Sequence, residues 1–370
     1  MSVNEQAASP KEMPIIQSCC TLLLLQHKLL SSYPLYLHSV IETMTLANWS
    51  YELIHQVLEE EAIDLQSRCS VARVNRRMRE LVLPILYRSI EFNISKLEAS
   101  NVGESRLLVL QRTLSENTYL AAFVHYLKIS WESGSDAAPR DVVLIDPELG
   151  KGINDILSRV LNLQSLVLEM TGRQAALRPT YQCSFLAASN PFAELRELRI
   201  RGLSIKIDTV AVVFGLPKLE VFEVQILALS HQIIAGKHDT SIRSTVKDLS
   251  IGPYCQPNWD LERIFWWPSG LEKLTYDLGA ECPPPPFDVP TLSQLLAPQS
   301  DTLVCLHLTG SNWVTTRLSN LDFRLFSKLK HLKIASTILF PCKSESLVDR
   351  TPYRNSLYKR LPKSLERLEV

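Results

Sequence analysis

The residue types that could carry out chemistry are spread along the chain without the spacing of a metal site or a disulfide framework. Eight cysteines lie at irregular intervals, at positions 19, 20, 69, 183, 255, 282, 305 and 342. They include no C-x-x-C pair, and no Cys/His group has zinc-finger spacing. Irregular spacing in a long chain favours reduced thiols in an intracellular protein over disulfides. The sequence therefore predicts no metal and no cofactor.

Enzyme motifs are also missing from the sequence. It contains no G-x-S-x-G, H-E-x-x-H or G-x-G-x-x-G motif. Gly150-Lys151-Gly152 resembles part of a P-loop, but Ile145 stands where glycine is needed and no Ser or Thr follows the lysine. We predict that the protein is not an enzyme.

The composition narrows the class of protein. The chain has 370 residues, more than one ordinary core holds, and its 46% hydrophobic content excludes a disordered protein. Its 39 basic residues balance 39 acidic ones, so we expect no nucleic-acid partner and no membrane partner. The arginine cluster over 68–79 lies close to Glu59, Glu60 and Glu61, which favours a solvated helix face over a nucleic-acid site.

Residues 1–48 differ from the rest of the chain, and we expect a poorly ordered N-terminal extension there. Their apolar stretch from Ile15 to Leu25 is interrupted by polar residues, and no basic region precedes it. A signal peptide or a membrane span needs a cleaner apolar run. We therefore expect a cytoplasmic protein, a nuclear protein or both.

A six-residue phrase recurs through the remaining sequence. Leucine, the commonest residue at 60 of 370, dominates it. The phrase is apolar-x-x-apolar-x-apolar, and it begins at Val124, Leu163, Leu195, Leu219, Val246, Leu271, Leu303, Leu329 and Leu365. Alternation over its last residues predicts a strand whose apolar side chains point into the core. The ninth phrase ends on Val370, so its core layer is expected to be the least covered.

The phrase and its spacing of 24 to 39 residues resemble the leucine-rich-repeat family over residues 87–370. This resemblance implies an α/β fold: an irregular right-handed solenoid with parallel strands on its concave side and helices on its convex side. The family carries Asn or Cys eight residues after the first leucine. Here those positions hold Glu132, Thr171, Leu203, Leu227, Tyr254, Gly279, Ser311 and Thr337, so no asparagine ladder is expected.

A helical module is expected between the extension and the repeats. The phrase from Tyr51 to Leu58, Y-E-L-I-H-Q-V-L, has an apolar stripe, and a second helix is expected over 69–81. The segment 83–92 is expected to change from a short helix into a strand. These phrases resemble the F-box family over Trp49–Tyr87, and P-I-L-Y-R-S-I (84–90) with the segment 105–117 is similar to fungal F-box proteins. The expected domains are therefore 1–48, a three-helix F-box-like module over 49–87, and the repeats over 88–370.

The combined resemblance implies the substrate-recognition subunit of a cullin-RING ubiquitin ligase. The F-box would dock on the Skp-type adaptor of the ligase, and the repeats would bind a protein substrate. The alternative is a leucine-rich-repeat scaffold that binds a partner without any ligase link. The residues expected to face the adaptor are Leu53, Ile54, Val57, Leu58, Val71, Val74 and Met78.

The substrate would bind the concave face. In each repeat strand, the residues that alternate with the buried ones point to this face. They are Lys128, Glu169, Glu197, Arg199, Arg201, Glu223, Asp248, Lys273, Asp277, His307, His331 and Lys333. Because the set is mixed in sign, we expect a protein partner rather than a polyanion.

Overall fold

The computed structural model describes ten stretches of the chain and divides it into two units. The described stretches are 50–60, 63–94, 106–132, 147–171, 192–228, 243–252, 264–277, 294–309, 322–335 and 357–370, so the expected extension 1–48 lies outside them. One unit holds the described residues up to Ile90 together with Tyr119–Val124, and the other holds Glu91–Thr118 and His125–Val370. Within the described residues, no helix is both long and apolar enough to cross a membrane.

Three helices form the first unit, and a polar side chain caps the start of each. They are α3 (Tyr51–Glu59), α4 (Leu65–Ala72) and α5 (Arg76–Arg88). Ser50 accepts a hydrogen bond from the Leu53 N–H at 3.2 Å, which satisfies a backbone donor that the helix leaves unpaired. Asp64 caps α4 and Asn75 caps α5 in the same way, at 2.7 and 2.8 Å.

The Asn75 cap corrects the helix expected over 69–81. This segment contains the end of α4, a turn at Arg73 and Val74, and the start of α5. Asparagine competes with the helix backbone for hydrogen bonds and favours a helix start, so it breaks the apolar stripe at this point. Val74 consequently lies in the turn and is 40% exposed.

The apolar stripes of the three helices meet in a small core of their own. Its buried members are Ile54, Leu58, Ile63, Val71, Met78, Leu81 and Val82, and Val57, Ala72, Ile85 and Leu86 pack against them. The core draws residues from each of α3, α4 and α5, which explains how helices of only 8 to 13 residues hold together.

The strands form one ten-stranded sheet whose order follows the chain, from β1 to β10. Every pairing from β2 to β10 is parallel. The strands are β1 (Ser89–Ile94), β2 (Tyr126–Glu132), β3 (Ser165–Thr171), β4 (Glu197–Lys206), β5 (Val221–Ala228), β6 (Asp248–Ile251), β7 (Lys273–Asp277), β8 (Cys305–Thr309), β9 (His331–Ile334) and β10 (Arg367–Glu369). The predicted α/β class and the predicted parallel strands are thus confirmed, with one strand for each of the nine phrases.

The apolar positions of the phrases form the core of the sheet. In the first eight phrases all three are buried, as Leu163, Leu166 and Leu168 illustrate. In the ninth phrase, Leu368 and Val370 are 38% and 65% exposed.

One backbone arrangement repeats between all nine phrases. The carbonyl of the second residue in a phrase accepts hydrogen bonds from the N–H groups of the second and third residues of the next phrase, at 2.7 to 3.1 Å. The accepting residues are His125, Gln164, Arg196, Glu220, Lys247, Glu272, Val304 and Lys330. Each phrase therefore sits on its predecessor in the same register, although the segments between phrases differ in length.

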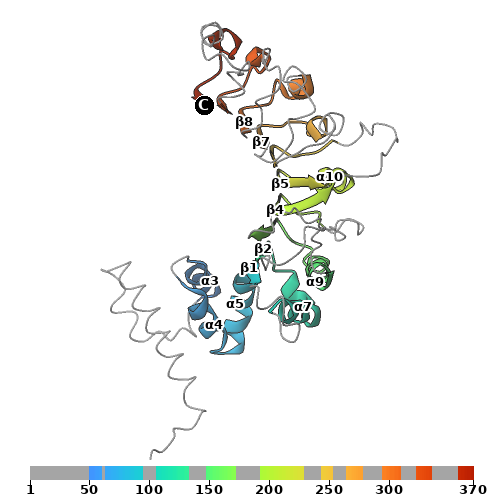
Figure 1. Cartoon of the computed structure of the whole chain (residues 1–370). Coiled ribbons are helices and arrows are strands. Elements are labelled where there is room, and N and C mark those ends of the chain that lie inside the picture. Colours follow the sequence, from blue (N-terminus) through green and yellow to red (C-terminus); the bar gives the residue numbers. More distant parts are fainter. Residues whose placement is uncertain are drawn as a thin grey trace, which may run out of the picture. The chain divides into compact units, whose positions relative to one another are not determined.

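The return segments lie on one side of the sheet, where Figure 1 shows α7 (Arg106–Glu116), α9 (Pro147–Leu157) and α10 (Ile207–Phe214). The remaining described helices are α8 (Thr118–Ala121) and the short 3-10 helices η4 (Ala297–Gln299), η6 (Phe323–Leu325) and η8 (Leu357–Arg360). α9 begins at Pro147, and proline suits this position because the first N–H groups of a helix have no partner within the helix. Trp267 is buried before Pro268, whereas Trp266 is half exposed.

Side chains from return segments satisfy backbone groups that lie just before the strands, in place of an asparagine ladder. The buried Gln299 donates to the carbonyls of Phe265 and Pro268, both at 2.8 Å, and accepts from the Leu271 N–H at 3.1 Å. Thr245 and Ser364 directly precede their phrases, and each donates to the first carbonyl of the preceding phrase, that of Leu219 or Leu329.

Candidate protein-interaction face

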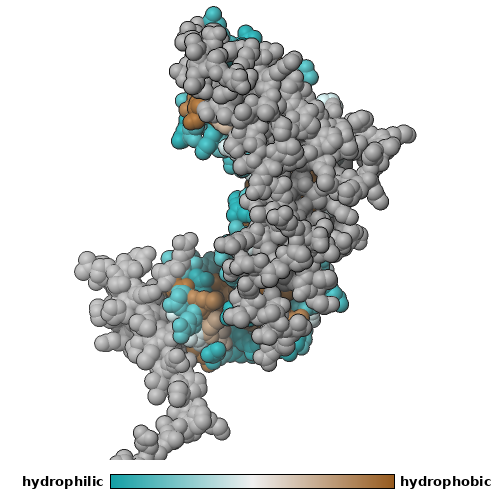
Figure 2. Space-filling model, viewed as in Figure 1, coloured by the Kyte–Doolittle hydropathy of each residue, from teal (hydrophilic) through white to brown (hydrophobic). Residues whose placement is uncertain are grey.

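The polar face of the sheet consists of the third, fifth and seventh residues of the phrases. Strand register places equivalent residues side by side, so that Glu169 lies beside Arg201 and Arg199 lies beside Glu223. Along the margin where Figure 1 draws β4 to β8, Figure 2 shows hydrophilic side chains. Parallel pairing therefore turns charges that are distant in sequence into continuous rows.

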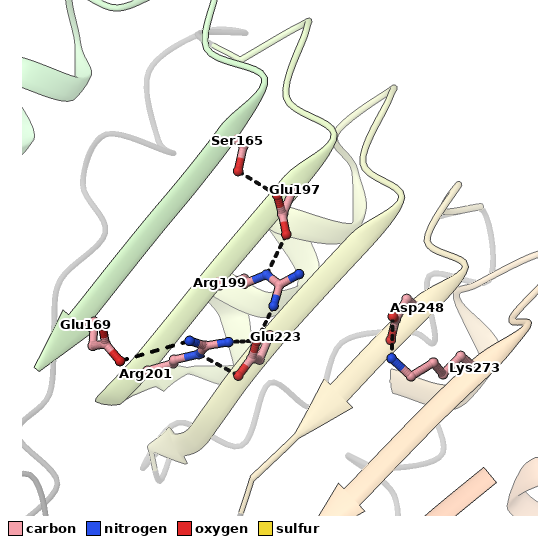
Figure 3. Close-up of polar contacts among 8 residues, drawn as sticks. All are labelled: Ser165, Glu169, Glu197, Arg199, Arg201, Glu223, Asp248 and Lys273. Atoms are coloured by element: carbon pink, nitrogen blue, oxygen red, sulfur yellow. Dashed lines mark hydrogen bonds and ion pairs between the residues drawn. The ribbon is translucent and has the colours of Figure 1, made fainter. Parts of the chain in front are cut away.

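A charged network occupies this face on β2 to β5. Arg201 binds Glu223 through two hydrogen bonds of 2.7 Å, and it lies 4.0 Å from Glu169 on its other side (Figure 3). Arg199 joins Glu223 at 3.3 Å and also binds Glu197. Each guanidinium lies between carboxylates: Arg199 has Glu197 on its own strand and Glu223 on β5, and Arg201 has Glu223 on β5 and Glu169 on β3.

Two further contacts extend this network toward β2. Lys128 forms an ion pair with Glu169 at 3.3 Å, and the Ser165 hydroxyl donates to Glu197 at 2.6 Å. The central network is thus Lys128, Ser165, Glu169, Glu197, Arg199, Arg201 and Glu223. Its three cations balance its three carboxylates.

Gly202 shapes the network by allowing β4 to bulge directly after Arg201. Its φ of +68° lies in the left-handed region that favours glycine. A Cβ atom at Gly202 would lie 2.1 Å from the Met170 carbonyl oxygen. The register of β4 against β5 shifts between Ile200 and Ser204, and Arg201 stands at the start of this shift.

Partial burial strengthens the electrostatics of the network. The side chains of Arg201 and Glu223 are only 32% and 19% exposed. The hydrogen bonds to Glu223 raise the pKa of the Arg201 guanidinium above its ordinary value, against an opposing effect of desolvation. Bidentate, partly desolvated pairs are more specific than the ion pairs of a fully exposed surface.

A second polar group lies on β6 to β10. Lys273 binds Asp248 at 2.8 Å, and Lys333 lies 3.4 Å from Glu369. Between these pairs, the sulfur of Cys305 and Nε2 of His307 are 3.2 Å apart. Burial, the largest cause, raises the pKa of the Cys305 thiol and lowers that of His307.

All twelve residues predicted for the concave face lie on strands β2 to β9. Six of them join the central network, and Asp248 and Lys273 form a pair of their own. Asp277, His307, His331 and Lys333 lie on β7 to β9, outside that network. The prediction missed Ser165, Cys305, Arg367 and Glu369, although all four are third or fifth residues of their phrases and the same alternation rule selects them.

The residues predicted to face the adaptor separate into two groups. Ile54, Leu58, Val71 and Met78 are at most 4% exposed in the core of the helical unit, so their placement on a docking surface is corrected. The short helices use most of their apolar side chains to form the core that they share. The apolar stripe in the sequence does not show which of these side chains remain on the surface. Leu53 and Val74 are 45% and 40% exposed, and Val57 is half-buried against the core.

Among the described residues, no group of three or more His, Cys, Asp or Glu side chains is arranged to hold a metal ion. The sequence matches no protein-family model and no curated protein.

Proposed function

We propose that this protein is a substrate-recognition subunit of a cullin-RING ubiquitin ligase. In this proposal the helical unit is an F-box that docks on the Skp-type adaptor. The parallel sheet with its return segments is a leucine-rich-repeat solenoid that binds a protein substrate. The observation that carries the proposal is a core shared by three short helices, followed in the chain by a sheet with one strand for each repeated phrase.

Exposed apolar side chains on the helical unit support docking. Tyr51, Leu53, Leu65 and Val74 are 40% to 65% exposed although the unit has a well-filled core. Figure 2 shows hydrophobic side chains among hydrophilic ones over α3 to α5. Burying such side chains against a partner contributes roughly 25 cal/mol for each Å² of apolar surface removed from water.

The central network supports recognition of a protein rather than of nucleic acid. A polyanion would have to compete with Glu169, Glu197 and Glu223 for every cation of the network. A folded partner with its own pattern of both charges can pair with the network without that competition. Such complementarity favours specificity and fast association over high affinity.

Copurification with the Skp-type adaptor tests the proposal. We expect the full-length chain to bring down the adaptor. The double variant Leu53→Asp with Val74→Asp should lose it, because it places two charges on the exposed apolar surface and leaves the core intact.

The control is Val109→Asp with Val212→Asp, which alters residues of α7 and α10 that are 48% and 47% exposed. This control should retain the adaptor. Loss of the adaptor from both double variants, or from neither, would contradict docking through α3 to α5. If the wild-type chain binds no adaptor at all, the scaffold function without a ligase link replaces the proposal.

A further inference from the structure

A row on β7, β8 and β9 differs in chemistry from the central network. Strand register places Thr275 beside His307, and His307 beside Lys333. Lys273 precedes Thr275 by two residues and so points to the same face. Because neighbouring strands lie about 4.8 Å apart, the four side chains surround one small area, which we name the His307 patch.

The His307 patch has hydrogen-bond donors at its centre and carboxylates around them. Asp248 and Glu369 lie at the two ends of the row, and Asp277 follows Thr275 by two residues on the same face of β7. Asp248 binds Lys273 at 2.8 Å, and Glu369 lies 3.4 Å from Lys333. Each lysine is therefore paired on one side, and its ammonium group has three donors. In the central network, by contrast, each guanidinium has carboxylates on two sides.

The Cys305 contact uses Nε2 of His307, so Nδ1 is the ring nitrogen that can donate to a ligand. The sulfur of Cys305 and Nε2 of His307 are 3.2 Å apart, and which of the two atoms donates depends on the tautomer of the imidazole. In the imidazolium form both ring nitrogens carry a proton, so Nε2 donates to the sulfur and Nδ1 offers an N–H donor to an anion.

We propose that Lys273, Thr275, His307 and Lys333 bind an oxyanion, either the carboxylate of an acidic protein segment or a phosphate monoester carried on such a segment. The proposal rests on the proposed function, since it names the chemistry of the segment that the sheet would recognise. Two ammonium groups, a hydroxyl and an imidazole N–H supply donors from several directions. An oxyanion at the centre would convert two separate ion pairs into one continuous site.

Binding would couple to the protonation of His307. In the free protein burial lowers the pKa of His307, and Lys273 and Lys333 lower it further, against smaller opposite effects of Glu369 and Asp248. Asp277, Cys305, His331 and Arg367 are the other titratable or charged residues on this face of β7 to β10. A bound anion favours the imidazolium and raises this pKa, so affinity should increase as the pH falls below neutral.

Histidine-selective NMR of the full-length chain tests the proposal. With the Cε1 positions labelled and His307→Gln used to assign the signal, inorganic phosphate and acetate are titrated separately at constant ionic strength. We expect a saturable shift of the His307 signal that is stronger below neutral pH. A response to phosphate alone would identify a phosphate monoester as the ligand, and equal responses would identify a carboxylate.

Variants show whether the patch itself binds the anion. Lys273→Met with Lys333→Met should weaken binding about tenfold or more, because two charge-assisted contacts are lost. Thr275→Val keeps both ion pairs and should weaken binding a few-fold. Lys151→Met removes an exposed lysine of α9, outside both the patch and the central network, and should leave the affinity unchanged. An unresponsive His307 signal, or equal losses in the Lys151 control and the double variant, would overturn the proposal. Adaptor copurification depends on the helical unit, whereas anion binding depends on the sheet. Failure of one proposal is therefore distinguishable from failure of the other.

Discussion

Replacing Gln299 by leucine should destabilise the sheet strongly, although the new side chain is apolar and of similar size. Gln299 is 2% exposed and serves three backbone groups: the carbonyls of Phe265 and Pro268 and the N–H of Leu271. Leucine can make none of these hydrogen bonds. The three groups would then remain buried without a partner from this side chain.

The expected loss follows from the cost of unsatisfied buried groups. Each of the three groups costs about 1–3 kcal/mol, and the better burial of leucine returns only about 1 kcal/mol, so we expect a net loss of about 2–8 kcal/mol. The loss should be concentrated near β7, because Leu271 begins the phrase of that strand.

Urea unfolding and hydrogen exchange measure this effect. The unfolding midpoint of Gln299→Leu should fall, and exchange of the Leu271 N–H should accelerate. Gln56→Leu is the control because Gln56 is exposed on α3, and it should change stability by less than about 0.5 kcal/mol. An unchanged midpoint together with an unchanged exchange rate at Leu271 would refute this account of Gln299.

Three further changes test other parts of the structure. Gly202→Ala should cost about 2–4 kcal/mol in unfolding free energy, since it combines the left-handed φ with a clash against the backbone at Met170; equal stability in urea would contradict the bulge. A double-mutant cycle of Arg201→Ala and Glu223→Ala should give a coupling of about 1 kcal/mol that decreases with salt, and a coupling near zero would argue against the bidentate pair. Asn75→Ala should destabilise the helical unit by about 1 kcal/mol in thermal unfolding, and no change would count against the α5 cap.

The repeated phrase was sufficient to predict the sheet. Alternation of large apolar residues identified nine strands, and parallel pairing places Leu166 beside Leu198 as a repeat requires. The prediction succeeded because burying one side of a strand constrains every second residue. The bulge at Gly202 was not predicted, although the sequence carries a signal for it: the apolar positions change from Leu198 and Ile200 to Leu203 and Ile205, a shift of one residue across a glycine.

The helical unit was predicted less well. An apolar stripe in a short helix identifies the buried side but not the boundary between the core and a docking surface. Met78 and Val74 were therefore given the same role, although one is in the core and the other in a turn. The Asn75 cap was the available signal for this division, because asparagine favours the start of a helix.

The buried Gln299 escaped prediction for a different reason. Its partners lie 28 to 34 residues earlier in the chain, and only the return segment between β7 and β8 brings it to them. No local pattern marks a polar residue that the fold uses in this way.

Binding of the purified full-length chain to the purified Skp-type adaptor, measured by isothermal titration calorimetry, tests the proposed function most directly. We predict a complex with one adaptor per chain and a negative heat-capacity change, because docking would bury the exposed apolar side chains of α3 to α5. The Leu53→Asp and Val74→Asp variant should show no heat of binding while its unfolding transition is retained. An absence of binding by the wild-type chain, under conditions in which the adaptor binds a known F-box, would contradict the account.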